Sequence, residues 1–416
     1  MAKTIIEKII QNHTKDEVSQ GKIVWMDLDV MSARDFGGPN VVKNLEKEYG
    51  DAPLADSKKT FFTFDLCVPP CSMKYADNQQ FCREYARKHG IKVFDIDRGI
   101  GSHVLIEEGL ALAKKTVVGT DSHMNILGAV GCFGQGMGDV DIAFAFKTGK
   151  TWFEVPETIK VLLKGNFTWP TSPKDLTLYI LKKMGTRKAA LKAIEFYGES
   201  VSSLSLSGRI TLCSMVTEMA GIIGFIPEYG DSLSSEVEEL IKESYSPYLA
   251  DKDAVYREVV EIDVGSLPPQ VAAPFKPTNV YDVSRLRGVK IDTGFIGCCT
   301  NGRKEDFKAA ACVLEGKKIK DGITLKIVPA TRKVYAELLE EGILETLFKG
   351  GAIISNPGCG GCAEGHIGLT GTGEVQISTG NRNFAGKQGK GKTYIASPEV
   401  VVASCISGEI TNPEDL

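Results

Sequence analysis

Two glycine-rich cysteine loops, each placed directly after a predicted strand, constrain this chain more than any other feature. Cys359 and Cys362 lie in Asn-Pro-Gly-Cys-Gly-Gly-Cys, which follows a strand expected over Ala352–Ser355. Cys299 lies in Gly-Cys-Cys-Thr-Asn-Gly, which follows a strand expected over Val289–Thr293. Because an open α/β sheet gathers its ligands at the carboxyl ends of its strands, the three thiolates could converge on one site.

The number of cysteines in these loops separates several kinds of site. Structural zinc usually takes four protein ligands, and a two-cysteine redox motif needs no third cysteine. A [4Fe–4S] cluster held by three cysteines has one iron without a protein ligand, and that iron can act as a Lewis acid. Alternatively, Cys359 and Cys362 are turn residues of a reduced protein, and the C-x-x-C spacing alone leaves both interpretations open.

Length, charge and cysteine content limit the class of protein. A chain of 416 residues is too long for one ordinary core, so two or three domains are expected. The net charge of −4 gives no electrostatic reason to expect nucleic acid or an anionic membrane as a partner. No apolar run approaches the roughly 20 residues that span a bilayer. Eleven cysteines without a signal-like start predict a reducing cytoplasm rather than a disulfide framework.

Strand-like and helix-like segments alternate along the chain, which is typical of α/β layers with a partly parallel sheet. Strands are expected over Ile23–Met31, Phe61–Val68, Ile91–Ile96, Thr116–Gly119, Ile159–Leu163, Val289–Thr293, Thr324–Pro329 and Ala352–Ser355. Helices are expected over Thr4–Gln11, Ala76–His89, Leu105–Lys114, Leu176–Met184, Arg187–Tyr197, Ser234–Tyr245, Glu305–Leu314 and Lys333–Glu341. The fold class is therefore predicted to be α/β.

Two positions along the chain are candidate domain boundaries. The first is the segment Val155–Glu157, which precedes the strand expected over Ile159–Leu163. The second is Ser266–Thr278, whose Pro- and Ala-rich composition is typical of a linker. We expect α/β domains over residues 1–157, 158–280 and 281–416, and the third of these carries the cysteine loops.

Two of the five histidines lie in glycine-flanked turns between a predicted strand and a helix. In Gly-Thr-Asp121-Ser-His123 the aspartate stands two residues before the histidine, where it could orient the imidazole and set its protonation. The alternative is a strand-end turn with a surface histidine. His103 lies in Gly-Ile-Gly-Ser-His, and a lone histidine is more often structural. The glycines that follow His123 lack the context of a dinucleotide-binding motif, so NAD binding is not indicated.

Two further charged positions are candidates for a site. Glu218 lies in the apolar segment Met215–Gly221, so it is either buried and paired or an acid/base with a perturbed pKa. Arg382 lies in the loop Asn381–Lys387, where it could hold a substrate carboxylate through charge-assisted hydrogen bonds. The alternative for Arg382 is a solvated surface loop.

Five motifs, taken in order, carry a resemblance to a known family. They are Gly119-Thr-Asp-Ser-His, Gly149-Lys-Thr-Trp-Phe-Glu-Val-Pro-Glu-Thr, Cys299-Thr-Asn-Gly-Arg, Gly358-Cys-Gly-Gly-Cys and Asn381-Arg-Asn-Phe-Ala-Gly. Together they resemble the aconitase superfamily, and within it the large subunits of 3-isopropylmalate dehydratase and homoaconitase. The resemblance runs essentially from one end of the chain to the other.

The resemblance implies three α/β domains around one [4Fe–4S] cluster per subunit. Its ligands would be Cys359, Cys362 and Cys299, which precedes Thr-Asn as the family ligand does, whereas Cys298 need not bind metal. The chain stops at Leu416 without the mobile fourth domain of single-chain aconitases, which supplies a serine base and an arginine. A separate small subunit is therefore expected as a partner, and this chain alone is expected to be inactive.

The resemblance also implies roles for particular residues. The expected catalytic residues are Asp65, His103, Asp121, His123 and Glu218, and the expected substrate-binding residues are Asn381, Arg382 and Lys387. Hydroxide is a poor leaving group, so a metal and a proton donor must share its developing charge. The proton beside a carboxylate is weakly acidic, so the negative charge formed on its removal needs cationic partners.

Three positions depart from the family pattern. The family usually has Asp-His where this chain has Asp65-Leu66, and a leucine cannot transfer a proton. Lys387 stands where the family has a second arginine, and Ser214 stands where it has an asparagine. Because the three cysteines remain, we expect an altered substrate rather than a loss of activity. Cys67 either replaces the missing histidine or is a buried structural cysteine.

The leading hypothesis is a hydro-lyase acting on a small branched 2-hydroxy dicarboxylate. Candidate substrates are 3-isopropylmalate, homocitrate or homoaconitate, and acids of the citramalate or dimethylmalate type. A second hypothesis, from another class, is a non-catalytic iron-sensing or RNA-binding protein of aconitase ancestry, although the mild acidity of the chain argues against it. A third is a degenerate scaffold subunit.

Overall fold

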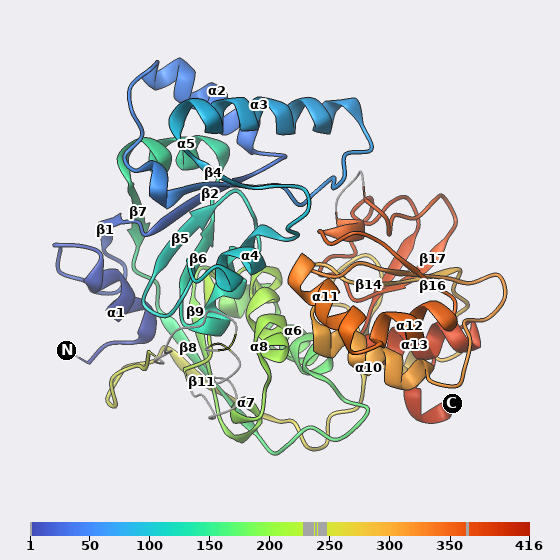
Figure 1. Cartoon of the computed structure of the whole chain (residues 1–416). Helices are drawn as coiled ribbons and strands as arrows, with labels where there is room; N and C mark the ends of the chain where they lie inside the picture. Colours follow the sequence, from blue (N-terminus) through green and yellow to red (C-terminus); the bar gives the residue numbers. More distant parts are fainter. Residues whose placement is uncertain (1, 228–236, 238, 240–247, 363–365) are drawn as a thin grey trace.

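The computed structural model describes residues 2–227, 237, 239, 248–362 and 366–416. Figure 1 shows helices packed against sheets that follow one another from the blue N-terminal to the red C-terminal part of the chain. The described strands form sheets of five, four and seven strands and a two-stranded ribbon. The predicted α/β class is therefore confirmed. No helix among the described residues is long and apolar enough to cross a membrane.

The first sheet has the strand order β4-β3-β2-β5-β6 and is parallel throughout. Its strands are β2 (Val30–Arg34), β3 (Thr60–Thr63), β4 (Lys92–Phe94), β5 (Thr116–Gly119) and β6 (Phe133–Gly136). The helices of this region are α1 (Ile5–Asn12), α2 (Gly38–Tyr49), α3 (Met73–His89), α4 (Gly101–Glu107) and α5 (Asp139–Thr148). An antiparallel ribbon joins β1 (Ile23–Asp27) to β7 (Lys150–Glu154). Because helices cover the sheet, β3 and β5 are buried along their whole length.

The second sheet has the order β10-β9-β8-β11 and is also parallel. Its strands are β8 (Thr158–Lys164), β9 (Ala193–Tyr197), β10 (Ile223–Phe225) and β11 (Glu258–Asp263). The accompanying helices are α6 (Pro173–Ala189), α7 (Glu199–Ser202) and α8 (Leu206–Ser214). In Figure 1, α6 and α8 lie between this sheet and the helices of the third sheet.

The third sheet has the order β13-β12-β18-β17-β14-β15-β16, and only the pairings of β12 are antiparallel. Its strands are β12 (Gln270–Ala272), β13 (Val280–Asp282), β14 (Thr293–Ile296), β15 (Thr324–Ile327), β16 (Ala352–Ile354), β17 (Val375–Ser378) and β18 (Lys392–Ile395). Its helices are α10 (Lys304–Leu314), α11 (Arg332–Glu340), α12 (Ile343–Lys349) and α13 (Pro398–Ser407). Parallel β14, β15, β16 and β17 carry their carboxyl ends to one edge, from which both cysteine loops leave.

Four sequence-based element assignments were wrong or misplaced. The helix expected over Arg187–Tyr197 contains only the end of α6, which stops at Ala189, and then a turn and β9, because the apolar run at its end is a buried parallel strand. The strand expected over Ile23–Met31 is divided between β1 and β2, which belong to different sheets. The helix expected over Leu105–Lys114 begins earlier and ends at Glu107. The strand expected over Val289–Thr293 lies instead at β14.

The remaining expected elements have counterparts of the same type, apart from one helix. That helix, expected over Ser234–Tyr245, lies largely outside the described residues. The strands of the three larger sheets and the ribbon group as residues 23–154, 158–263 and 270–395. The division into domains at 157/158 and 280/281 stays a prediction.

Four helix N-termini meet at a small cavity of about 200 Å³ behind the Cys299 loop. The cavity is lined by the first turns of α6, α8, α10 and α13. Asp175 and Asp306 belong to the capping boxes of α6 and α10, and Glu399 lies in the first turn of α13. The positive ends of the helix dipoles favour these carboxylates. Burial nevertheless raises the pKa of Glu399 to about 8, with the charge of Asp175 adding to the rise.

Candidate active site

A cavity of about 880 Å³ lies between loops of the first and third sheets. Most segments that line it follow the carboxyl end of a strand, as the sequence predicts for a ligand site in an α/β fold. Its polar and sulfur-bearing lining residues include Arg34, Asp121, His123, Cys298, Cys299, Cys359, Cys362, Arg382 and Lys387. Seven of the residues predicted from the sequence therefore line one cavity.

The three predicted ligand cysteines come from the loops after β14 and β16. Cys299 and Cys359 are each 5% exposed, and Cys362 is half-buried. Asn381 Nδ2 donates a hydrogen bond to Cys299 Sγ at 3.1 Å, and Arg34 Nη2 donates one to Cys359 Sγ at 2.6 Å. Sulfurs that accept such bonds in a buried wall are suited to hold a metal group as thiolates.

The donor set also distinguishes a cluster from a single ion. Among the described residues, no three His, Cys, Asp or Glu side chains are arranged to hold one metal ion. A single zinc ion requires its sulfur ligands about 2.3 Å from one point, whereas cluster cysteines each bind a different iron. Cys298 is buried, has a positive φ of 68°, and lies 3.4 Å from Asn381 Oδ1. The cysteine chemistry and spacing fit a cluster better than a single ion.

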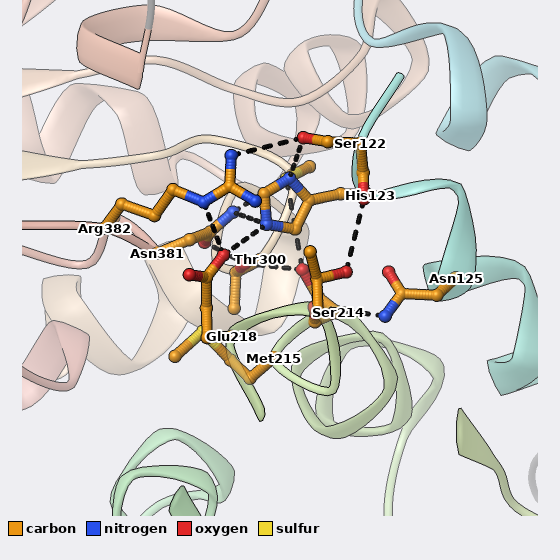
Figure 2. Close-up of polar contacts among 12 residues, drawn as sticks. Ser122, His123, Asn125, Ser214, Met215, Glu218, Thr300, Asn381 and Arg382 are labelled. Atoms are coloured by element: carbon orange, nitrogen blue, oxygen red, sulfur yellow. Dashed lines mark hydrogen bonds and ion pairs between the residues drawn. The ribbon is translucent and has the colours of Figure 1, made fainter. Parts of the chain in front are cut away.

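His123, Glu218 and Arg382 form a charged group, as Figure 2 shows, and His123 and Arg382 line the cavity. His123 Nε2 lies 3.1 Å from Glu218 Oε1, and Arg382 Nε donates to the same oxygen at 2.7 Å. Arg382 Nη1 also donates to Ser122 Oγ at 3.3 Å. The loops after β5 and β17 and the turn after α8 therefore place three predicted residues in direct contact.

Burial and charge act in opposite directions on this group. Burial alone would lower the pKa of His123, but the nearby Cys299 and Glu218 outweigh it and raise that pKa to about 9. Burial alone would raise the pKa of Glu218, but His123 and Arg382 outweigh it and lower that pKa. Both neighbours therefore favour the protonated form of His123.

Asp65 and Asp121 both contact Arg34, a residue that the sequence alone did not identify as part of the site. Arg34 Nε donates to Asp65 Oδ1 at 2.7 Å, and Arg34 Nη1 lies 3.0 Å from Asp121 Oδ1. Asp65 is fully buried and does not line the cavity. Burial raises its pKa to about 7, although Arg34 opposes the rise. Arg34 was missed because the strand expected to end at Met31 continues as β2, which ends at Arg34.

His103 lies behind the cavity wall rather than in it. Its Nε2 donates to the backbone oxygen of Cys299 at 2.9 Å, and its Nδ1 lies 3.5 Å from Arg303 Nη1. Burial, followed by the charge of Arg303, lowers the pKa of His103 to about 3. This arrangement supports the loop that carries Cys299.

The three departures from the family pattern all lie at or beside the cavity. Leu66 and Lys387 line it, and Leu66 packs against Ile100 and the wall that contains Cys299. Ser214 Oγ lies 2.7 Å from Thr300 Oγ1. Thr300 Oγ1 in turn donates a hydrogen bond to Asn381 Oδ1. Ser214 therefore belongs to the polar network that includes Asn381 and His123 (Figure 2).

Cys67 does not replace the missing histidine in this structure. Its side chain is fully buried, and its sulfur lies 3.6 Å from the sulfur of Cys71. Gln79 Nε2 donates to its backbone oxygen at 3.0 Å, and the backbone N–H of Cys71 donates to its sulfur at 3.2 Å. Cys67 therefore packs with the start of α3 instead of facing the cavity.

Lys174 is a second functional candidate that was missed. It is fully buried in the first turn of α6, and its Nζ donates to the backbone oxygens of Thr379 and Gly380 at 2.8 and 3.0 Å. Burial lowers its pKa to about 8. A lysine beside a predicted helix start carries no sequence signal for such a role, because its partners are distant backbone atoms. It holds the turn that presents Asn381.

Comparison with known proteins gives matches over the whole chain. The profile described as Aconitase family (aconitate hydratase) matches residues 7–287 and 282–408. The 3-isopropylmalate dehydratase large subunit 1 of Methanopyrus kandleri is 40% identical over 416 residues, covering 99% of each chain. The corresponding large subunit of Hydrogenobaculum sp. is 39% identical over 420 residues, covering 100% of this chain and 99% of the other. The crystal structure of Thermococcus kodakaraensis aconitase X covers 86% of this chain and 84% of its own, at 15% identity and a TM-score of 0.48.

Proposed function

The chain belongs to the aconitase family, and we propose that it is the large subunit of a hydro-lyase that dehydrates a small branched 2-hydroxy dicarboxylic acid of the 3-isopropylmalate type. The observation that carries this proposal is one cavity lined by four cysteines, three of them the predicted ligands, together with His123 and four arginine or lysine side chains. Dehydration of a dicarboxylate needs an acid for the leaving hydroxyl and positive charge for the carboxylates. The names of the full-length relatives support the same activity.

Cys299, Cys359 and Cys362 would hold one [4Fe–4S] cluster. Their sulfurs line the cavity, and two of them accept hydrogen bonds from Asn381 and Arg34. When bound, the cluster supplies an iron without a protein ligand, which acts as a Lewis acid toward the substrate hydroxyl and one carboxylate.

His123 is the proton donor that we assign to the departing hydroxyl. When protonated, its Nε2 donates to Glu218 Oε1 at 3.1 Å, which fixes the orientation of the ring. Glu218 stabilises the imidazolium and so keeps the proton available. Asp121 Oδ1 accepts the backbone N–H of His123 at 3.0 Å and fixes the loop that carries it.

Arg382 and Lys387 are the groups that we assign to the substrate carboxylates. Arg382 is a planar donor whose Nε is already bound to Glu218, so Glu218 sets the direction of its remaining N–H groups. Lys387 adds a point charge at the same cavity without the fork of an arginine. A leucine at position 66 gives the cavity an apolar wall, which suits a branched alkyl group and favours a substrate other than citrate.

A small subunit and a reducing compartment complete the proposal. The names of the relatives imply a small subunit, and the family resemblance assigns a serine base and an arginine to it. Proton abstraction would therefore require both subunits. All eleven cysteines lie within the described residues, and none of them forms a disulfide bond, which supports a cytoplasmic location.

Anaerobic reconstitution with iron and sulfide tests the function. The protein is expected to acquire iron, acid-labile sulfide and the brown absorbance of a cluster, and to lose them in air. Turnover of a panel of substituted malates is expected only after a small subunit is added. A reconstituted chain that binds no iron would contradict the proposal. Turnover restricted to homocitrate or 2,3-dimethylmalate would retain the reaction type and change the substrate.

A further inference from the structure

Arg34 is the most highly connected cation of the cavity, and its guanidinium contacts three chemically different partners. Nε donates to Asp65 Oδ1 at 2.7 Å, Nη1 lies 3.0 Å from Asp121 Oδ1, and Nη2 donates to Cys359 Sγ at 2.6 Å. The Arg34 side chain is only 12% exposed. One cation is therefore bound by two buried carboxylates and one buried sulfur.

The contacts of Arg34 join elements of two sheets. Arg34 ends β2, and Asp65 and Asp121 follow β3 and β5 of the first sheet, whereas Cys359 follows β16 of the third. The backbone N–H of Cys359 also donates to the backbone oxygen of Asp65 at 2.9 Å. The Cys359 loop is thus attached to the first sheet twice, once through backbone and once through the guanidinium.

Each oxygen of the Asp65 carboxylate accepts one hydrogen bond. Oδ1 accepts from Arg34 Nε, and Oδ2 accepts from the backbone N–H of Gly101 at 2.8 Å. Arg34 and the backbone of Gly101 therefore fix the orientation of this carboxylate. The family pattern has a histidine directly after this aspartate, whereas here Asp65 hydrogen-bonds an arginine, which keeps its charge and does not transfer protons.

We propose that Arg34 is a positioning residue that holds Asp65, Asp121 and the sulfur of Cys359 as one charged unit, in place of the Asp–His pair of the family pattern. This inference rests on the proposed function for its catalytic consequence, although the contacts themselves do not depend on it. A fixed positive charge and an N–H···S hydrogen bond at a ligand sulfur raise the reduction potential of a cluster. The same unit fixes the loop of Asp121 and so the neighbouring His123.

The test compares Arg34→Gln and Arg34→Lys with Arg83→Gln in the full-length chain. Arg83 is a matched control, because it binds Asp95 through Nε and Nη2 at 2.7 and 2.6 Å but lies outside the cavity. In reconstituted protein, Arg34→Gln is expected to shift the cluster to a lower reduction potential and to change its electron paramagnetic resonance signal. Arg34→Lys is expected to shift it less, and Arg83→Gln not at all.

A second readout uses protein without metal and does not depend on activity. Hydrogen exchange of the Cys359 amide, which is bonded to Asp65, is expected to be faster in Arg34→Gln and unchanged in Arg83→Gln. This measurement keeps the proposal testable if the variant cannot be loaded with iron. Unchanged exchange in Arg34→Gln would overturn the proposal.

Steady-state kinetics with the small subunit completes the test. Because a misplaced catalytic group costs about 10²-fold in rate, Arg34→Gln is expected to lower kcat by that order while changing KM about twofold or less. If wild-type protein binds iron and turns over, while Arg34→Gln has an unaltered reduction potential and kcat, only the role of Arg34 would be overturned. Wild-type protein that neither binds iron nor turns over would overturn the proposed function instead, and the exchange measurement would still decide the role of Arg34.

Discussion

Asn381 donates a hydrogen bond from Nδ2 to the sulfur of Cys299 across 3.1 Å, and the same nitrogen lies 3.0 Å from His123 Nε2. One amide nitrogen therefore lies close to both a proposed ligand sulfur and the proposed proton donor. Asn381 and Cys299 lie 82 positions apart in the sequence, on the loops after β17 and β14. Under the proposed function, cluster binding and proton donation therefore share one neighbouring side chain.

Replacing the three ligand cysteines one at a time is expected to abolish cluster binding. Cys299→Ser, Cys359→Ser and Cys362→Ser each remove a thiolate that lines the cavity, so iron content after reconstitution should fall to background. Cys298→Ser is the matched control, because the neighbouring Cys298 sulfur is directed to Asn381 Oδ1. Iron and sulfide analysis with the visible spectrum gives the result, and loss of iron in Cys298→Ser would contradict the assignment.

Leu66→His is expected not to create a new proton-transfer pair. Both oxygens of Asp65 are already bound, to Arg34 and to the backbone of Gly101. A working general acid or base contributes about 10²- to 10⁴-fold to a rate. Steady-state kinetics with the small subunit should therefore show no gain of that size. A gain of that order from Leu66→His alone would show that Asp65 is free to pair with a histidine.

Replacement of Arg382 and replacement of Lys387 are expected to change the kinetic constants differently. Arg382→Gln removes both the Glu218 contact and a donor for substrate, so kcat/KM should fall by about 10²-fold or more. Lys387→Gln removes one half-buried charge at the cavity and should raise KM by about tenfold. Lys387→Arg restores the charge and should remain close to wild type. Equal effects of Arg382→Gln and Lys387→Gln would contradict the separate roles.

Glu399→Gln is expected to change how stability depends on pH. The pKa of Glu399 is raised from 4.5 to about 8 by burial, so its contribution to stability is complete below pH 4.5 and is lost as the pH rises through about 8. The variant has no such proton to lose. The free energy of unfolding of the variant, relative to that of wild type, should therefore rise by roughly 1 to 3 kcal/mol between pH 5 and pH 8.

Urea unfolding of the metal-free protein at both pH values measures this difference. Glu305→Gln is the control, because Glu305 lines the same small cavity at the start of α10. It separates the effect of removing a carboxyl group from this cavity wall from the effect of the Glu399 proton. A Glu399→Gln protein that loses stability relative to wild type at pH 8 would contradict the prediction.

Local sequence patterns predicted the α/β class, most strands, and the positions of the cysteine loops. They succeeded where a buried strand ends in a glycine-rich turn, since both signals are local. Arg187–Tyr197 failed because its lysine, alanine and leucine residues favour a helix, whereas β9 is stabilised by strands at Thr158–Leu162 and Ile223–Phe225. Parallel pairing of strands so far apart in the sequence produces no recognisable pattern within a short stretch of residues.

The candidate site shows the same contrast: residues within one short motif were predicted, and contacts between distant residues were not. His123 and Asp121 were found because a motif holds both. The pairing of Glu218 with Arg382 could not be predicted, since 164 positions separate them. Arg34 was missed because β1 and β2 were assigned to one strand, although β1 pairs with β7 and β2 with β3 and β5.

All three ligand thiols leave a single sheet, whereas Arg34, Asp65 and His123 belong to another. The seven-stranded sheet thus carries the complete ligand set before the five-stranded sheet closes over it. Because the proposed ligands come from one sheet, we expect a chain whose two sheets separate to keep the three thiols together and to expose them.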